Sequence, residues 1–191
     1  MSRPEGSRPE QRTEYTEKGS VRKQAVRARE SLSAVEREER SRRVAERIAA
    51  LPEFRAAHTV MLYRAVRGEL SLDALPFLPA AAGKRFVYPR CVSGTDMIAM
   101  FPGGWEPGAF GIPEPAETSS ETVPPGEIDL VVCPGTAFDD RGTRLGMGAG
   151  YYDRFLAEHS GETACLCFRA LMRADLPAEE TDVPVDQVVT D

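Results

Sequence analysis

Several features that would define common protein classes are missing from this sequence of 191 residues. No apolar run approaches the roughly 20 residues that a membrane-spanning helix needs, and the N-terminus lacks the apolar segment of a secretory signal. The 24 Lys and Arg residues are outnumbered by 30 Asp and Glu, and the net charge of −6 disfavours general binding to nucleic acid. We therefore expect one cytoplasmic globular domain with neither membranes nor nucleic acids as partners.

Residues that could bind zinc are also scarce. The histidines and cysteines of the chain are His58, His159, Cys91, Cys133, Cys165 and Cys167. No C-x-x-C pair occurs, and Cys165 and Cys167 would point to the same face of a strand. Buried, reduced thiols in a cytosolic protein explain this pattern better than a metal centre does.

The first fifty residues are expected to form a polar leader followed by two helices. Residues 1–19 are rich in charge, with proline and glycine, and we expect them to be disordered. Ser20 can cap a first helix, whose apolar residues recur at helical spacing as far as Leu32. Ser33 and Glu36 have the spacing of a capping box, which predicts the start of a second helix.

Apolar runs later in the chain predict strands that alternate with helices. The predicted strands span residues 59–63, 85–88, 97–101, 130–133 and 163–168, and the predicted helices span 72–82 and 151–159. This alternation predicts a single three-layer α/β/α domain over residues 20–191 with a mainly parallel sheet. Ligands of such a sheet bind in loops at the carboxyl ends of its strands.

The most informative stretch is residues 129–156, where a buried strand, a glycine-rich loop and a helix follow one another. This arrangement places backbone N–H groups around an anion, and glycine lets the backbone approach a ligand closely. Arg144 and Asp153, on either side of the glycines, suggest phosphates together with Mg²⁺. The glycine spacing alone matches neither G-x-G-x-x-G nor a Walker A loop, and a flexible turn remains the alternative.

As a whole, this stretch closely resembles the signature of the 5-formyltetrahydrofolate cyclo-ligase family, also called methenyltetrahydrofolate synthetases. The resemblance is carried by Pro134-Gly135, by Ala137-Phe138-Asp139 and by the run from Arg144 to Leu156. It implies an enzyme that uses ATP and Mg²⁺ to convert 5-formyltetrahydrofolate into 5,10-methenyltetrahydrofolate, ADP and phosphate. The small-molecule partners would be the folate and ATP, and we expect a monomer or weak dimer.

The resemblance also implies roles for particular residues. Lys23-Gln-Ala-Val-Arg27 is similar to the family's Lys-x-x-x-Arg motif, whose lysine and arginine contact ATP phosphates. With Arg144, Lys23 and Arg27 would be the catalytic residues, and a solvated helix face laced with ion pairs is the alternative for this basic run. The remaining implied ATP contacts are Leu145, Gly146, Met147, Gly148, Ala149, Gly150, Tyr151 and Tyr152.

The folate would be bound by Glu69 and Tyr152. The family has a similar glycine-glutamate pair after its first strand, and a carboxylate can accept both N–H groups on one edge of a reduced pterin. The alternative for Glu69 is a cap for a helix that starts near Ser71. Trp105 and Phe110, in the proline-rich segment 102–127, could cover a flat heterocycle, although the more ordinary interpretation is that they pin this segment to the core.

Asp153 and Asp186 are the implied Mg²⁺ ligands. Asp186 belongs to a D-x-x-x-D segment that is similar to the C-terminal motif of the family, and a turn or edge-strand carboxylate is its alternative. Three positions depart from the family pattern, namely Met147, Ala149 and Leu171. These departures favour a second interpretation, a non-catalytic or altered-substrate paralogue that binds folate or nucleotide. A third, a relative of sugar-phosphate isomerases or CoA-transferases, rests on fold analogy alone.

Overall fold

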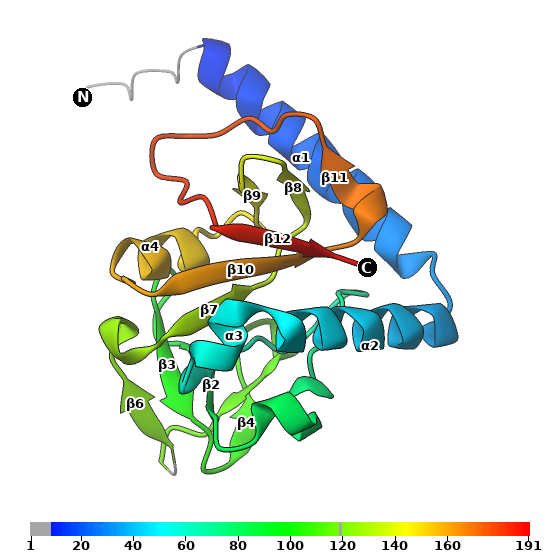
Figure 1. The fold of residues 1–191 in the computed structure, drawn as a ribbon. Helices are drawn as coiled ribbons and strands as arrows, with labels where there is room; N and C mark the ends of the chain where they lie inside the picture. Colours follow the sequence, from blue (N-terminus) through cyan, green and yellow to red (C-terminus); the bar gives the residue numbers. More distant parts are fainter. Residues whose placement is uncertain (1–8, 119) are drawn as a thin grey trace, which may run out of the picture.

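The computed structural model describes residues 9–118 and 120–191, with side chains described from Glu17 onward except for that of Phe110. Its helices surround a central sheet (Figure 1). The α-helices are α1 (Pro9–Glu30), α2 (Ala34–Ala50), α3 (Pro52–Ala56) and α4 (Tyr151–Ala157). Short 3₁₀ helices are η1 (Leu75–Phe77), η2 (Pro79–Ala81), η3 (Ala109–Gly111), η4 (Pro125–Glu127) and η5 (Arg169–Leu171). None of the helices among the described residues is both long and apolar enough to cross a membrane.

The strands of the described residues fall into one large sheet and two small ones. The large sheet has the order β12-β10-β7-β1-β2-β3-β6. Its strands are β1 (Thr59–Met61), β2 (Arg85–Cys91), β3 (Met97–Phe101), β6 (Glu121–Val123), β7 (Leu130–Cys133), β10 (Glu162–Cys167) and β12 (Gln187–Thr190). The small sheets contain β4 (Trp105–Pro107) with β5 (Pro113–Pro115), and β8 (Ala137–Asp139) with β9 (Arg144–Leu145) and β11 (Met172–Arg173).

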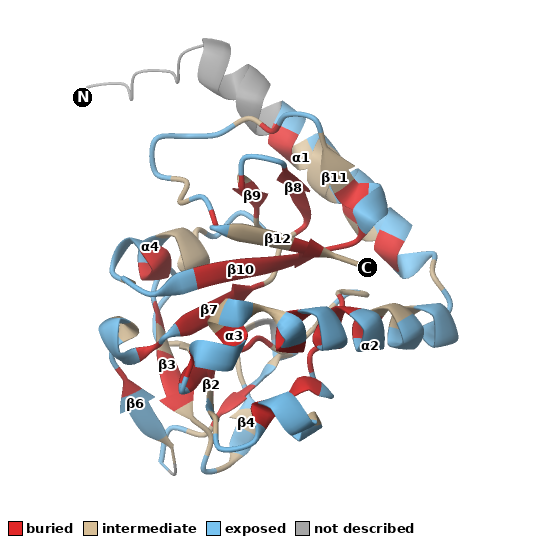
Figure 2. Ribbon diagram, in the orientation of Figure 1, coloured by how far each residue is buried: buried red, intermediate tan, exposed pale blue. Residues whose placement is uncertain are grey.

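The large sheet is mainly parallel, as the sequence predicts. Every pairing from β12 to β2 is parallel, and only β3 and β6 join the sheet in antiparallel fashion. The central strands β1 and β7 are buried along their whole length, and the neighbouring β10 is buried except at its first residue (Figure 2). Such continuous apolar runs are typical of parallel strands covered on both faces. The predicted α/β fold with one mainly parallel sheet is therefore confirmed.

The order of the strands creates a switch point between β1 and β7. From β1 the chain crosses towards β2, while from β7 it crosses in the opposite direction towards β10. Right-handed crossovers in opposite directions place their connections on opposite faces, which sets α4 across the sheet from η1 and η2. The loops that leave the carboxyl ends of β1 and β7 consequently diverge, and ligands of open α/β sheets bind at such a point.

Helix α1 begins at Pro9, so the prediction that Ser20 caps the first helix is wrong. Residues 9–19 are helical rather than part of a disordered leader. The buried Lys18 explains part of this extension, because its ammonium group bonds to Glu179 and Asp182 far along the chain. Residues 1–8 lie outside the described residues, and the start of the folded domain stays a prediction.

Two further local predictions had different outcomes. The capping box of α2 is confirmed, because the Ser33 hydroxyl accepts from the Glu36 N–H and the Glu36 carboxylate accepts from the Ser33 N–H. The predicted helix over 72–82 is instead the 3₁₀ pair η1 and η2. Pro76 and Pro79 each lie in the first turn of one of these elements, and a proline cannot supply the N–H that a continuous helix needs.

The proline-rich segment 102–127 is anchored rather than merely connecting. It forms β4, β5 and β6, and the buried Glu114 accepts from the backbone N–H groups of Cys91 and Ala109. Trp105 packs edge-on against Tyr88, with ring centroids 5.0 Å apart. This contact agrees with the interpretation that Trp105 pins the segment, while the side chain of Phe110 lies outside the described residues.

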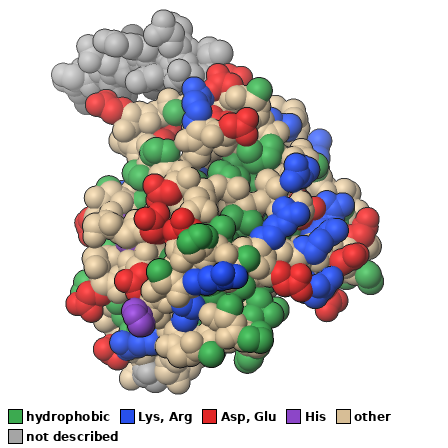
Figure 3. Space-filling model, in the orientation of Figure 1, with side chains coloured by type: hydrophobic (Ala, Val, Ile, Leu, Met, Phe, Trp, Pro, Cys, Tyr) green, Lys and Arg blue, Asp and Glu red, His purple; other side chains and the backbone are tan. Residues whose placement is uncertain are grey.

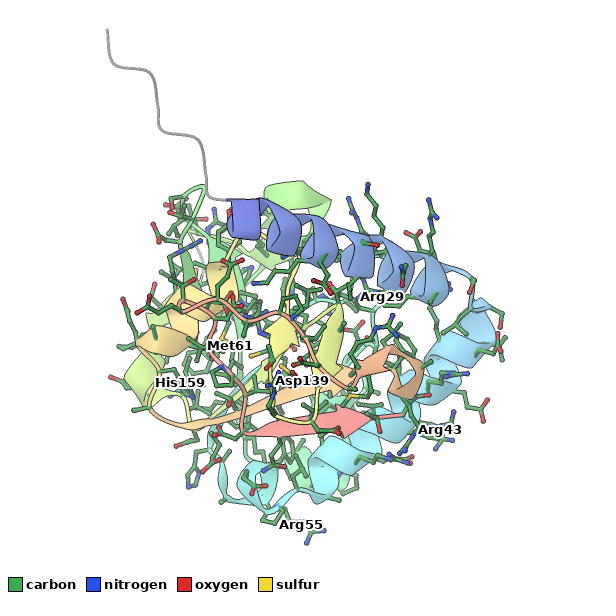
Figure 4. All side chains as sticks on the ribbon, turned by 90° about the horizontal axis from the view of Figure 1, so that it is seen from above. Arg29, Arg43, Arg55, Met61, Asp139 and His159 are labelled. Carbon is green, nitrogen blue, oxygen red and sulfur yellow. The ribbon has the colours of Figure 1, made fainter. Side chains whose placement is uncertain are left out.

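The β8–β9 hairpin, which the sequence did not predict, is organised by Asp139. This fully buried carboxylate accepts from the backbone N–H groups of Arg141 and Thr143 at 3.0 Å and of Leu176 at 3.2 Å, and from the Arg141 guanidinium. Figure 4 shows Asp139 near the centre of the molecule. The same carboxylate therefore closes the turn before Arg144 and holds the later segment around Leu176 beside it.

We predict that Asp139→Asn lowers the free energy of unfolding by about 1–3 kcal/mol, because an amide N–H₂ would face donors. Burial raises the pKa of Asp139, but hydrogen bonds from Arg141 and Thr143 outweigh this and hold the pKa below its ordinary value. The stability that the carboxylate supplies is therefore present above about pH 4 and is lost as the pH falls through the folded-state pKa.

Urea unfolding between pH 3 and 7 measures both effects, with the exposed neighbour Asp140→Asn as the matched control. Equal losses for the two variants would contradict the role of Asp139, as would an unchanged acid dependence in Asp139→Asn.

Candidate functional site

The glycine loop is a packed structure rather than a flexible turn. Gly142, Gly148 and Gly150 have positive φ angles, which only glycine adopts readily. A Cβ atom at Gly142 would lie 2.1 Å from the Val185 carbonyl oxygen. Ala149 is not among the residues with positive φ, so its departure from the family pattern brings no backbone strain.

Arg144 is the most constrained charged residue of this loop. It leaves β9 with 5% of its surface exposed, and its Nη2 donates to Asp153 Oδ1 at 2.7 Å. Its guanidinium carbon lies 5.5 Å from the centroid of the Tyr152 ring. The Nε–H has no partner among the described residues. The structure therefore brings Arg144, Tyr152 and Asp153 together, while the roles that the sequence suggests for them stay predictions.

The other loop residues are oriented in different directions. Leu145 is buried, the Gly146 carbonyl accepts from Arg22 at 2.8 Å, and Met147 is 49% exposed. The Tyr151 hydroxyl donates to the Ser93 carbonyl at 3.0 Å, which ties α4 to the turn between β2 and β3. Burial raises the pKa of Tyr152 well above its ordinary value, so this hydroxyl stays a neutral phenol.

The face of helix α1 that contacts the glycine loop is not the one that carries Lys23 and Arg27. Lys23 and Arg27 are exposed, as a solvated helix face would be. Lys18, Arg22 and Arg29 lie on the opposite, inward side together with the buried Ala25, because positions 18, 22, 25 and 29 share one face of a helix. Figure 3 shows Lys and Arg side chains gathered on the surface over α1 and α2. The predicted phosphate contact by Lys23 and Arg27 is not supported by this placement.

A second Lys-x-x-x-Arg run explains the difference. Lys18-Gly-Ser-Val-Arg22 has the same spacing, five residues earlier. Arg22 donates to Gly146, and Lys18, only 4% exposed, donates to Glu179 at 2.9 Å and Asp182 at 2.8 Å. Burial lowers the pKa of Lys18, but its hydrogen bonds to these two carboxylates outweigh this and raise it. The spacing of this run can be read from the sequence, whereas its orientation towards the loop depends on contacts with distant residues.

Glu69 lies at the switch point, in the loop after β1. Its side chain is 7% exposed, and its Oε2 accepts from the Val66 N–H at 3.1 Å. Its Oε1 accepts from Arg29 Nη1 at 3.4 Å. Burial raises the pKa of Glu69, and the charge of Arg29 partly offsets this. No helix starts at Ser71 within the described residues, so the helix-cap alternative for Glu69 is wrong.

The two aspartates predicted to bind Mg²⁺ have separate partners. Asp153 Oδ1 accepts from Arg144 and from the Val183 N–H at 3.3 Å. Asp186 Oδ2 accepts from the N–H and hydroxyl of Thr163, at the start of β10. These bonds are what the edge-strand alternative for Asp186 predicts. No group of three metal-ligating side chains occurs in the part of the chain that the structure describes.

The cysteines offer no activated nucleophile. Cys133, Cys165 and Cys167 are buried as predicted, whereas Cys91 is only half-buried. Burial raises the pKa of Cys167 to about 12 and that of Cys91 to about 11. Both therefore remain thiols at neutral pH, and the chemistry of the site falls to charged and hydrogen-bonding groups.

Fold and site together define an α/β protein built on one large, mainly parallel sheet, with a glycine loop, a basic helix face and a buried carboxylate near the switch point of that sheet. The model of the 5-formyltetrahydrofolate cyclo-ligase family matches residues 14–191. The chain therefore belongs to the 5-formyltetrahydrofolate cyclo-ligase family. A curated Haemophilus influenzae 5-formyltetrahydrofolate cyclo-ligase is 28% identical over 185 residues, which cover 88% of this chain and 95% of the relative.

Solved structures give the same fold. An Aquifex aeolicus 5,10-methenyltetrahydrofolate synthetase is 35% identical with a TM-score of 0.78, and the match covers 91% of this chain and 89% of that one. A Mycoplasma pneumoniae 5,10-methenyltetrahydrofolate synthetase is 24% identical with a TM-score of 0.76. The match covers 90% of this chain and 97% of that one. At that identity the second likeness supports the fold alone.

The buried Arg144–Asp153 pair generates a prediction about stability. Asp153→Ala leaves a buried guanidinium without its partner and should cost about 3–5 kcal/mol of unfolding free energy. Arg144→Met should cost less, because the Asp153 side chain is 20% exposed and its carboxylate can turn to water. The double variant should be more stable than Asp153→Ala alone. Urea unfolding of the wild type, the two single variants and the double variant gives the coupling free energy of the pair. Strictly additive losses of unfolding free energy would show that the two residues are not coupled.

Proposed function

We propose that this protein catalyses the ATP-dependent cyclisation of 5-formyltetrahydrofolate to 5,10-methenyltetrahydrofolate, with release of ADP and phosphate. Membership of the cyclo-ligase family supports the reaction. The observation that carries it for this chain is the position of Arg22, which joins the inward face of α1 to the glycine loop that contains Arg144. Basic groups from two elements thereby converge where a nucleotide phosphate would lie.

The chemistry explains why charged groups suffice. A formamide oxygen is a poor leaving group, and transfer of the γ-phosphoryl group of ATP to it makes it a good one. N10 of the folate then attacks the former formyl carbon, phosphate leaves, and the five-membered ring closes. No protein nucleophile is needed. The protein has to align the formyl oxygen with the γ-phosphate and stabilise charge on the transferred group.

Arg144 is the residue we assign to the transferred phosphoryl group. Its guanidinium is held by Asp153 and by the Tyr152 ring, so little reorganisation is needed when charge develops. The Nε–H, which has no partner among the described residues, is a donor available to a phosphate oxygen. The backbone of Gly146, Gly148 and Gly150 would lie close to the same phosphates.

Lys18 and Arg22 take the place that the sequence assigned to Lys23 and Arg27. Both extend from the inward face of α1, and an arginine can bind phosphate through two parallel hydrogen bonds. Glu179 and Asp182 neutralise Lys18 in the structure described here. A nucleotide phosphate would compete with these carboxylates for the ammonium group.

Mg²⁺ would accompany the nucleotide, because it is usually bound by one or two carboxylates together with phosphates and water. Asp153 fits this role in part, since only its Oδ1 accepts hydrogen bonds from the described residues. Asp186 stays the second proposed ligand. The ion would neutralise phosphate charge, while the protein groups fix the position of the phosphates.

Glu69 and Tyr152 are the proposed folate contacts, on the side of the site nearest the switch point. The second interpretation, a non-catalytic or altered-substrate paralogue, is weakened at Ala149, which keeps an ordinary backbone conformation. Of the other two departures, Leu171 is buried and Met147 is exposed. We further propose a cytoplasmic location and a monomer or weak dimer.

The first functional prediction is formation of methenyltetrahydrofolate by the purified protein only when 5-formyltetrahydrofolate, ATP and Mg²⁺ are all present. Absorbance of the product and release of ADP should rise together in a ratio of one. ADP release at the same rate without folate would contradict the assignment, as would product formed without ATP. Binding of both ligands without turnover would favour the non-catalytic paralogue.

The second functional prediction compares the two faces of α1. Arg22→Gln should weaken the affinity for an ATP analogue by about tenfold or more, since a charge-assisted hydrogen bond contributes about 1.5–3 kcal/mol. The matched variant Arg27→Gln removes the same charge from the exposed face and should leave the affinity unchanged. Isothermal titration calorimetry measures both, and the reverse order of effects would restore the original assignment of Lys23 and Arg27.

A further inference from the structure

Arg29 carries a buried charge that has no role in the proposed reaction. It heads the largest fully buried side chains of the described residues, with 2% of its surface exposed. Figure 4 shows it on the side of α1 that faces the body of the molecule. Its Nε and Nη2 groups have no hydrogen-bond partner among the described residues. Burying a guanidinium with unpaired N–H groups lowers the stability of the fold, so its presence here calls for a physical reason.

The position of Arg29 supplies that reason. Its Nη1 donates to Glu69 Oε1 at 3.4 Å and to the Gly135 carbonyl at 3.3 Å. Glu69 lies in the loop after β1, and Gly135 lies in the loop after β7. Arg29 therefore joins the two loops that diverge at the switch point of the sheet, where ligands of this architecture bind.

The loop that contains Glu69 is fitted directly onto α1 at Arg29. Arg67 and Gly68 both have positive φ angles, so the backbone turns sharply before the glutamate. A Cβ atom at Gly68 would lie 3.1 Å from the backbone oxygen of Arg29. The positive φ and the close approach together favour glycine at position 68, and this turn brings the Glu69 carboxylate within reach of the guanidinium.

Both bonds of Arg29 Nη1 are at the long limit for hydrogen bonds. Two charges buried only for stability would be expected to meet in a shorter, bidentate arrangement. The observed pair leaves the Glu69 carboxylate fixed by Val66 and Arg29 but not saturated, since each of its oxygens has accepting capacity left.

We propose that Arg29 is a positioning residue for folate recognition, which keeps the Glu69 carboxylate anionic and aimed at the N–H and amino groups on the pterin edge. The proposal rests on the assignment of 5-formyltetrahydrofolate as the substrate. The ring N–H and the exocyclic amine are both donors, so a protonated Glu69 would present a donor to a donor. Arg29 prevents this by favouring the ionised carboxylate within a buried site.

Other titratable and charged groups near Glu69 cannot replace this effect. Tyr63 and Tyr152 are buried phenols whose pKa values lie well above the ordinary range. Arg67 lowers the pKa of Glu69 less than Arg29 does. Arg29 is the cation that bonds to the carboxylate in the described structure. Its removal should therefore raise the pKa of Glu69 further from its ordinary value.

The test is the affinity for 5-formyltetrahydrofolate, measured by calorimetry between pH 6 and 9, with an ATP analogue titrated separately. Arg29→Gln should weaken folate binding by about tenfold or more at pH 6.5, and the loss should shrink as the pH rises and Glu69 ionises. Arg29→Lys, which keeps the charge, should restore much of the binding at pH 6.5. Affinity for the ATP analogue should not change. The exposed Arg43→Gln, which removes one positive charge from α2, is the matched control.

The variants Glu69→Gln and Arg29→Gln/Glu69→Gln complete a double-mutant cycle. In the double variant both buried charges are removed, so neither is left without its partner. In the Glu69→Gln background, Arg29→Gln should have little further effect on folate affinity. An equal loss in both backgrounds would overturn the proposal, as would a loss that does not depend on pH or that affects the ATP analogue equally. Should Arg29→Gln fail to fold, Arg29→Lys and the double variant carry the same comparison. A wild-type protein that binds no 5-formyltetrahydrofolate would instead overturn the proposed function.

Discussion

A buried guanidinium must find partners, and the position of Arg144 shapes the segments around it. The side chain leaves β9 and meets Asp153 in the first turn of α4, so the glycine-rich residues between them are closed into a loop of fixed length. Asp153 also accepts the Val183 N–H, which brings the C-terminal segment to the same place. Because charge buried without a partner is destabilising, the contacts of each of these three segments with the others contribute to stability.

The orientation of helix α1 also depends on buried charges that need partners. Its inward face carries Lys18, Arg22 and Arg29, and each finds acceptors on a different part of the chain. A helix packed by apolar side chains alone would tolerate several rotations about its axis. Three cations with separate partners define one rotation, and that rotation turns Lys23 and Arg27 to solvent. The helix thus links the proposed phosphate side of the site, through Arg22, to the proposed folate side, through Arg29.

The sequence predicted those features that depend on local pattern. The fully buried β1 and β7, the Ser33–Glu36 capping box and the strand-loop-helix around Arg144 all follow from spacing and residue type. The orientation of α1 could not be predicted in this way, because two consecutive Lys-x-x-x-Arg runs, residues 18–22 and 23–27, have the same spacing. Only contacts with residues more than a hundred positions away, such as Gly146 and Glu179, distinguish them. The β8–β9 hairpin was missed for a related reason, since Asp139 holds it through hydrogen bonds to Leu176 as well as to its own turn.

The most direct test of this account is a crystal structure of the protein with an ATP analogue, Mg²⁺ and 5-formyltetrahydrofolate. We predict that the phosphates lie between the glycine loop and the inward face of α1, within hydrogen-bond distance of Arg22 and Arg144. The pterin should lie at the carboxyl ends of β1 and β7. Phosphates bound at Lys23 and Arg27, with the inward face of α1 unchanged, would contradict it.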